Sequence, residues 1–164
     1  MTTTPKNLTT VERASDRELV VTRTFNAPAR IVFDAWTKPE LLQRWWAPRS
    51  LGVTLFQCEA DVRVGGRYRY VFGHDARQPM AFSGMYTEVD SPRRLVFSQL
   101  FEPMPEAGEA IVTTTFEESA GKTRLVMHAL YPSKAALDGA VASGMERGIR
   151  DTHEQLEALV AALR

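Results

Sequence analysis

Three histidines and one cysteine are the side chains in this sequence best suited to metal binding or nucleophilic chemistry, but their spacing supports neither. His74, His128 and His153 are far apart, and none has another histidine or a cysteine at the spacing of a zinc site. Cys58 has no neighbouring histidine, and the G-x-S-x-G motif of serine hydrolases is absent. We therefore expect no metal, no cofactor and no catalytic residue. Cys58 is predicted to be a packing residue, and each histidine to be solvated or singly hydrogen-bonded.

Glycine-rich and basic stretches give no sign of phosphate or nucleic-acid binding. Gly65 and Gly66 lack the further glycines and the lysine of a phosphate-binding loop, so we interpret them as a hairpin turn. Arg67 and Arg69 alternate with aromatic residues, but Lys+Arg and Asp+Glu both count 20, which gives a formal net charge of zero. A neutral chain has no electrostatic preference for nucleic acid or for an anionic membrane surface. We expect both arginines to lie on a solvated face.

Aromatic residues are more informative, and Trp45 and Trp46 stand side by side in LLQRWWAPRS (41–50). Adjacent helical residues point about 100° apart, so one helix face cannot bury both rings against one flat partner. We predict that one ring fills the core and that the other borders a cavity opening. The alternative is that both are packing residues, because large amphipathic rings fill corners wherever a fold needs it.

Alternating aromatic residues in three expected strands predict an apolar pocket, which is the usual form of a small-molecule site. Alternation puts every second side chain of a strand on the same face. Gln99 is the polar member of that face, and a buried amide needs a partner from protein, water or ligand. The residues predicted to line the cavity are Trp36, Trp45, Trp46, Tyr68, Tyr70, Phe72, Phe82, Tyr86, Phe97, Gln99, Phe101, Met145, Ile149 and His153.

Local patterns place these residues in an α+β arrangement. Short β-branched or alternating segments predict strands; they are residues 18–25, 53–61, 65–73, 80–90, 94–101, 110–118 and 122–131. Proline and capping positions predict two short helices, over 26–36 and 37–46, with a bend at Thr37 and an end at Pro48. Residues 134–163 predict one long helix, or a short helix followed by a long one. Its internal glycines indicate either a break near 139–144 or a close approach to the sheet.

The length of the chain and the character of its N-terminal residues indicate how many domains to expect. Residues 1–16 are polar and aperiodic, so we expect a flexible tail followed by a single domain over 17–164. The N-terminus has no apolar stretch long enough for a signal peptide, and no run of about 18 apolar residues predicts a membrane span. The single cysteine excludes an intrachain disulfide. Together these features favour a cytoplasmic protein.

Several motifs resemble those of the START-like (SRPBCC) helix-grip superfamily, and within it the family named after the activator of Hsp90 ATPase homologue 1. The stretches that carry the resemblance are FNAPARIVFDAWTKPELLQRWWAP (25–48), VGGRYRY (64–70), FSGMYTEVDSPRRLVFS (82–98), TTTFEESAGKTRLVM (113–127) and GMERGIRDTHEQLEALV (144–160). The resemblance implies a curved seven-stranded antiparallel sheet, two short helices after the first strand and a long C-terminal helix across the concave face. It also implies an apolar cavity between sheet and helix. Gln99 and Ile149 stand where many members have tryptophan, so we expect a cavity that differs from the common version.

Three functions remain open after this resemblance. The one we favour is non-catalytic binding of a small hydrophobic molecule in the cavity. The family name suggests a second, a protein-interaction domain that activates an Hsp90-type chaperone ATPase, with a stress-related role. The superfamily also allows a polyketide cyclase or dehydratase-like enzyme, for which no cavity-facing acid and base pair can be named. A homodimer is left open.

Overall fold

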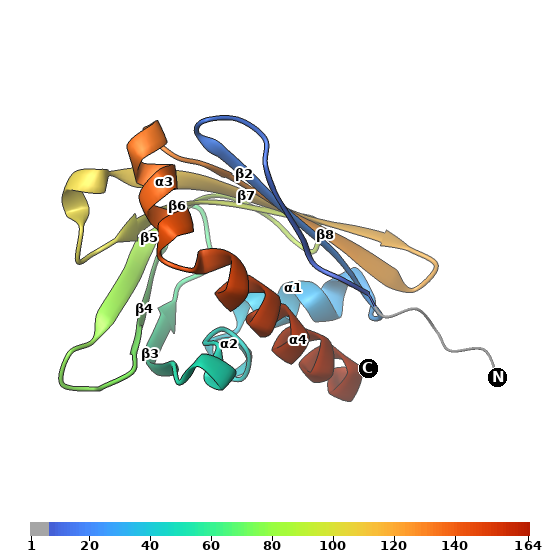
Figure 1. Ribbon diagram of the computed structural model, residues 1–164. Coiled ribbons are helices and arrows are strands. Elements are labelled where there is room, and N and C mark those ends of the chain that lie inside the picture. Colours follow the sequence, from blue (N-terminus) through green and yellow to red (C-terminus); the bar gives the residue numbers. More distant parts are fainter. Residues whose placement is uncertain (1–6) are drawn as a thin grey trace.

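The computed structural model describes residues 7–164 as a strongly curved antiparallel sheet with helices on its concave side (Figure 1). The strands are β1 (Thr10–Arg13), β2 (Glu18–Phe25), β3 (Thr54–Ala60), β4 (Arg67–Gly73), β5 (Met80–Asp90), β6 (Arg94–Phe101), β7 (Glu109–Ser119) and β8 (Lys122–Leu130). Their order across the sheet is β1-β2-β8-β7-β6-β5-β4-β3. This arrangement confirms the α+β helix-grip prediction, with eight strands in place of the seven expected.

The additional strand is β1, at one edge of the sheet. Thr10 pairs with Thr22 of β2, and Arg13 pairs with Leu19. For this segment the expectation of a flexible tail over 1–16 is wrong, because backbone pairing with β2 orders the residues without any apolar periodicity in their sequence. Residues 1–6 of that expected tail lie outside the described residues.

The helices follow the predicted order, but α2 is shorter than predicted. Their bounds are α1 (Ala29–Thr37), α2 (Pro39–Leu42) and the 3₁₀ turn η1 (Arg49–Leu51), then η2 (Pro105–Ala107), α3 (Lys134–Ala142) and α4 (Met145–Leu163). The bend after Thr37 is as predicted, but α2 ends at Leu42 and not at 46. Beyond it the N–H groups of Trp45 and Trp46 both donate to the carbonyl of Leu42, so the chain leaves the helix as a turn.

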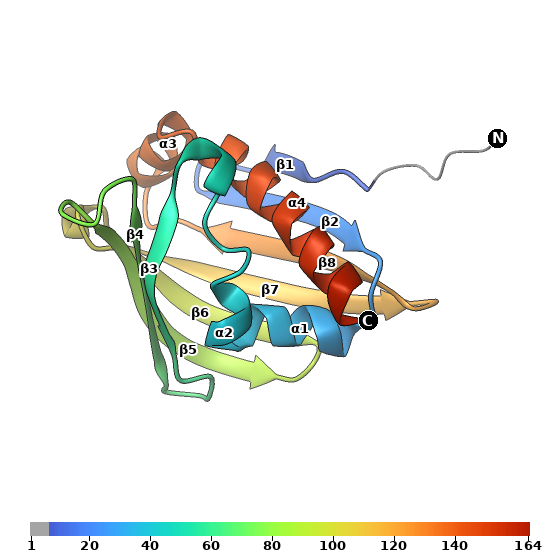
Figure 2. The same ribbon diagram turned by 90° about the horizontal axis from the view of Figure 1, so that it is seen from below.

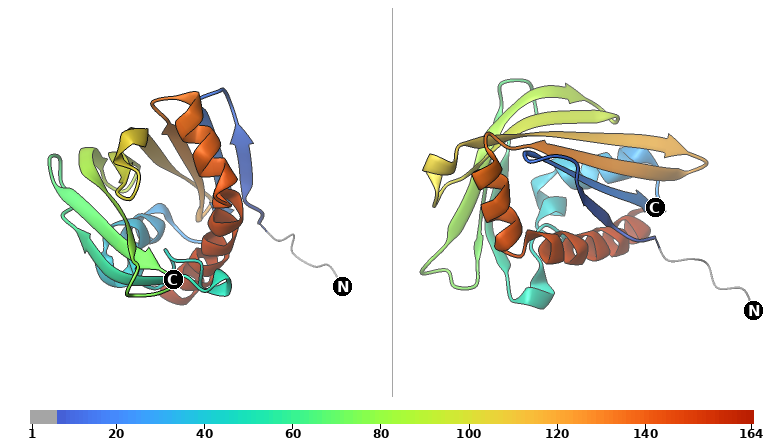
Figure 3. Two further views of the ribbon diagram at one scale, coloured as in Figure 1. Left: turned by 60° about the vertical axis from the view of Figure 1, so that its left-hand side comes forward. Right: turned by 45° about the horizontal axis from the view of Figure 1, so that its top comes forward.

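The C-terminal helix is broken, which was one of the two predicted forms. Gly144 has a φ of 87°, in the left-handed region that glycine adopts without strain. It separates α3 from α4, and Figure 3 shows the two helices running at an angle to each other. The break accounts for the glycine at position 144. The alternative, a close approach of the helix to the sheet, is not needed to explain it.

The core lies between the concave face and the helices. Figure 2 shows α1, α2 and α4 crossing this face, and α1 lies against β7 and β8 while α4 lies against α1. The predicted apolar stripe of α1 is buried at Ile31, Val32 and Ala35. Leu125 of β8 and Leu156 of α4 are buried in the same core. No helix within residues 7–164 has the length and apolar character that crossing a membrane requires.

Candidate functional site

Aromatic rings of β4, β5 and β6 lie on one face of the sheet, as strand alternation predicted. Tyr70 is directly opposite Phe82, and Phe82 is directly opposite Phe101. The rings of Phe72 and Phe82 stack with centroids 5.3 Å apart and planes at 11°, and Phe82 and Phe101 are 5.2 Å apart. The rings of Phe72, Phe82 and Phe101 therefore contact one another from strand to strand, and Tyr70 contacts Trp46 at 5.1 Å. These five rings form what we call the ring cluster.

Trp45 and Trp46 have different surroundings. Trp45 is 2% exposed, and its indole N–H donates to the carbonyl of Ala35 at 2.8 Å. Trp46 is only half-buried, and its ring lies 5.1 Å from Tyr70 and 5.2 Å from Phe72. The division into one core ring and one outer ring is as predicted. That Trp46 borders a ligand site stays a prediction.

Gly84 allows β5 and β6 to approach closely behind the ring cluster. A Cβ at this position would lie 1.8 Å from the carbonyl oxygen of Ser98 and 2.8 Å from the ring of Tyr68. The Tyr68 hydroxyl donates to that same carbonyl at 2.7 Å, so its ring covers the glycine. The neighbouring Met85 N–H donates to the Ser98 hydroxyl at 3.0 Å. The floor of this face is thus fixed by backbone contacts that no larger residue would allow.

Three buried tyrosines supply the hydroxyl groups of the concave face. Burial raises the pKa of Tyr68 and raises the pKa of Tyr70 well above its ordinary value. Burial also raises the pKa of Tyr86 to about 12. All three hydroxyls therefore stay protonated at neutral pH. They can donate hydrogen bonds, but they cannot serve as bases.

Five further predicted residues lie around these rings. Phe97 contacts the rings of Tyr68 and Tyr86, and it packs against both hydrophobic clusters of the core. Met145 and Ile149 pack against the second of these clusters. Gln99 is half-buried and pairs with Ala110 through the backbone, but its side-chain amide makes no hydrogen bond to residues 7–164, and the buried indole nitrogen of Trp36 likewise lacks a partner there. Gln99 and Trp36 thus hold polar groups without partners.

His153 lies apart from the ring cluster. It is 3% exposed, its Nδ1 is 3.0 Å from the Thr9 hydroxyl, and its ring meets the edge of Phe25 at 5.6 Å. Burial, followed by the positive charge of Arg23, lowers the pKa of His153 to about 3. The imidazole is therefore neutral at physiological pH. The structure places this predicted cavity residue beneath the N-terminal segment.

Arg23 is a buried cation that the sequence analysis did not identify. Its side chain is 1% exposed, and its Nη1 lies 3.4 Å from the Thr9 hydroxyl and 3.3 Å from Glu154 Oε1. Its Nε has no partner among residues 7–164. The available signal was alternation, since Arg23 stands between Val21 and Phe25 on the inward face of β2. We call Thr9, Arg23 and His153 the polar cluster.

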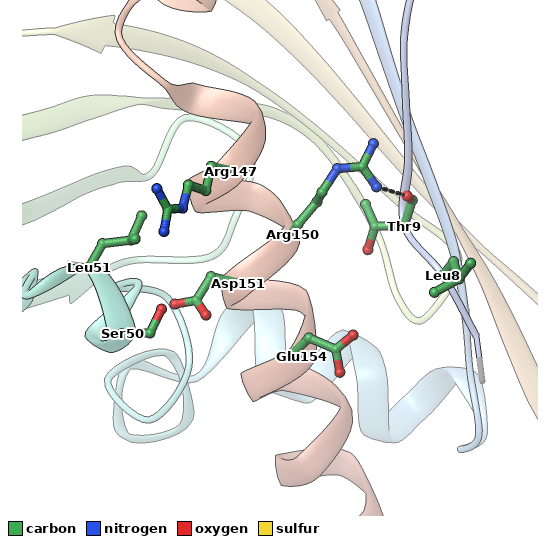
Figure 4. Close-up of a pocket in the computed structure, with 8 residues that line it drawn as sticks. All are labelled: Leu8, Thr9, Ser50, Leu51, Arg147, Arg150, Asp151 and Glu154. Carbon is green, nitrogen blue, oxygen red and sulfur yellow. Dashed lines mark hydrogen bonds between the residues drawn. The ribbon is translucent and has the colours of Figure 1, made fainter.

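Two of the hollows on the surface formed by residues 7–164 lie over or beside helices, and neither is lined by a predicted cavity residue. The larger, of about 390 Å³, runs over α4 (Figure 4) and is lined by Leu8, Thr9, Ser50, Leu51, Arg147, Arg150, Asp151 and Glu154. The smaller, of about 290 Å³, lies beside α1 and α2. The apolar cavity expected between the sheet and the C-terminal helix corresponds to neither hollow. The ring-to-ring contacts of the ring cluster lie on the concave face, and such contacts cannot be predicted from strand alternation.

Cys58, His74 and His128 have different surroundings. Within residues 7–164 no group of three or more histidine, cysteine or carboxylate side chains could hold a metal ion. Burial raises the pKa of Cys58 to about 11, so its thiol stays protonated and is a weak nucleophile. His74 Nδ1 lies 3.2 Å from the carbonyl of Gly52, and His128 Nε2 lies 2.7 Å from a carboxylate oxygen of Glu18. Both histidines are singly hydrogen-bonded, as predicted.

The fold and the arrangement of the helices define a helix-grip protein. Over residues 26–161 the sequence matches the family described as Activator of Hsp90 ATPase homolog 1-like protein, and the chain belongs to this family. No curated protein matches it.

Solved structures extend the match over nearly the whole chain. A protein from Rhodobacter sphaeroides is 27% identical with a TM-score of 0.85, over 94% of this chain and 99% of that one. One from Mycobacterium smegmatis is 26% identical with a TM-score of 0.82, over 93% and 96%. An HSP90 activator from Plasmodium falciparum is 22% identical with a TM-score of 0.56, over 70% and 73%, and shows the fold alone.

Proposed function

We propose that the chain is a non-catalytic binding protein that holds a small hydrophobic molecule against the ring cluster. The observation that carries the proposal is the half-burial of Trp46 in contact with several other rings. Clustered aromatic surface that remains open to solvent is typical of sites that receive apolar molecules. The ligand contacts the outer sides of these rings, because the space between them is occupied by the rings themselves.

Polar groups near the rings favour binding over catalysis. The amide of Gln99 has no partner among residues 7–164, so it can donate to or accept from a polar atom of the ligand. The hydroxyls of Tyr68, Tyr70 and Tyr86 remain protonated and provide no base. General acid–base catalysis needs a group whose pKa lies near the working pH, and none of these tyrosines meets that condition.

The proposal is tested by titrating the purified chain with the neutral apolar dye Nile red. We expect Trp46→Ala to weaken dye binding about tenfold, since removal of one ring contact costs on the order of 1.4 kcal/mol. Val64→Ala is the matched control, because Val64 is an exposed apolar residue in the turn before β4. Equal weakening by both variants, or no dye binding by the unaltered chain and no bound molecule in native mass spectra, would refute the proposal.

A second candidate function is stimulation of an Hsp90-type chaperone ATPase through the protein surface. The family description favours it. The test is an ATPase assay of an Hsp90-type chaperone with and without this chain. Stimulation that survives Trp46→Ala supports a surface-mediated role that is independent of the ring cluster. A chaperone that neither binds the chain nor responds to it rules this candidate out.

A further inference from the structure

We propose that residues 8–13 form a pH-sensitive strap, docked against β2 and α4 at neutral pH and released from its N-terminal end in mild acid. The strap consists of β1 and the two residues before it. It pairs with β2 through four residues only, so its docking depends strongly on contacts at each end. This inference is independent of the proposed ligand.

At its N-terminal end the strap is docked through Thr9, which is 5% exposed. The Thr9 hydroxyl lies between Nη1 of Arg23, at 3.4 Å, and Nδ1 of His153, at 3.0 Å. Figure 4 shows that Arg150 also donates to the backbone carbonyl of Thr9. Thr9 thus connects the strap to β2 and α4 at once.

The hydrogen bonds at Thr9 have a direction that depends on a neutral His153. An arginine can only donate, so the Thr9 hydroxyl accepts from Arg23, and in the His153 tautomer that carries its proton on Nε2 the hydroxyl gives its own proton to Nδ1. Protonation turns Nδ1 into a donor. The Thr9 hydroxyl then faces two donors and has no acceptor for its proton, which breaks the relay.

The charges around His153 oppose its protonation while the strap is docked. Arg23 of β2 and Arg150 of α4 are the cations bound to Thr9, and the carboxylate of Glu154 next to His153 in the chain is paired with Arg23 at 3.3 Å. Burial and the charge of Arg23 together hold the pKa of His153 at about 3. Displacement of Thr9 would admit water to the ring and raise its pKa toward the ordinary value of about 6.5. Falling pH therefore favours the undocked strap.

The other end of the strap is held by a contact that mild acid leaves intact. Arg13 lies 2.6 Å from Asp138 of α3, which also pairs with Lys134 at 2.8 Å. These cations hold the pKa of Asp138 below its usual range. Leu8, by contrast, is 70% exposed and lines the larger hollow. Opening therefore starts at Leu8 and proceeds toward Arg13.

Amide hydrogen exchange followed by NMR between pH 7.5 and 5.0 tests this proposal, after correction for the intrinsic pH dependence of exchange. If only His153 changes protonation on opening, the opening constant of the β1 amides should rise about thirty-fold over this range. His153→Gln cannot take up the proton, so its opening constant should stay nearly constant. His128→Gln is the matched control and should keep the full response. Thr9→Val should open more at neutral pH and respond less to acid.

Three results would overturn the strap, and two of them come from the opening constant alone. One is a flat opening constant in the unaltered chain between pH 7.5 and 5.0. The other is an undiminished acid response in His153→Gln. Should that variant fail to fold, the ring titration of His153 in the unaltered chain decides the matter. A His153 that titrates near pH 6.5 without any change in β1 exchange also overturns the proposal.

Discussion

The ring cluster around Trp46 and the polar cluster around Thr9 are stabilised in opposite ways. The rings meet through apolar surface, which has no required direction and leaves few hydrogen bonds to satisfy. The polar cluster depends on a hydrogen-bond relay in which a buried arginine, a hydroxyl and a neutral imidazole each have one role. A ring can shift by a fraction of an ångström and keep most of its contacts, whereas the relay fails when one proton is added.

This difference separates two kinds of sensitivity in one small fold. The ring cluster should respond to changes in side-chain volume and to apolar ligands, and hardly to pH. The polar cluster should respond to pH and to loss of a single hydroxyl. Each experiment below either sharpens this division or breaks it.

Trp45→Ala should have the largest effect, since this ring lies in the core beside the ring cluster. Loss of a buried tryptophan side chain costs about 3–5 kcal/mol of unfolding free energy, and the carbonyl of Ala35 would also lose its indole partner. Urea denaturation at pH 7.5 measures the change. Trp46→Ala is the matched control and should cost clearly less, because Trp46 is half-exposed. Equal losses would place both rings in the core and remove the distinction between them.

Acid should have the next largest effect, and it should act through the polar cluster. His153 has a pKa of about 3 in the folded chain and of about 6.5 when unfolded. Between these values the unfolded chain binds more protons, so stability is highest above pH 6.5 and falls as the pH drops. The loss from this group is about 2 kcal/mol at pH 5. Urea denaturation of the unaltered chain and of His153→Gln at pH 7.5 and 5.0 isolates it. An identical pH dependence in both proteins would contradict the assignment.

Thr9→Val should have the smallest effect on stability. Valine keeps the shape of threonine and removes the hydroxyl that joins Arg23 and His153. The expected cost is about 1 kcal/mol, because two buried groups each lose one partner. Thermal unfolding at pH 7.5 measures it, with Thr10→Val as the control, since Thr10 is exposed. A loss of equal size in Thr10→Val would show that strand pairing, and not the relay, is responsible.

Most of the fold was predictable because its elements follow local rules. Every predicted strand occurs within a few residues of its predicted bounds, since alternation and turn residues are properties of neighbouring positions. The break at Gly144 was likewise one of two forms that the sequence allowed. β1 was missed because TVER has no apolar period, and its order comes from pairing with β2. The early end of α2 was missed because the helical pattern continues to Trp46, whereas the chain forms a turn after Leu42.

The candidate site was predictable in part. Alternation identified the shared face of Tyr70, Phe72 and Phe82, but it could not say that the rings would pack on one another. The polar cluster could not be predicted from the sequence, for a different reason. The contact between Thr9 and His153 joins residues 144 positions apart, and no local pattern encodes such a pairing.

The short edge strand also protects its neighbour. Edge strands offer unpaired backbone groups to other chains, and short, charged or bulged edges make poor templates for aggregation. β1 has four residues that include Glu12 and Arg13, and β3 at the far edge is bulged between Leu55 and Gln57. β2 is eight residues long, regular and free of proline, so its main defence is the inward-pointing charge of Arg23. Release of the strap in acid would bare this strand, so intermolecular β-sheet growth should begin there.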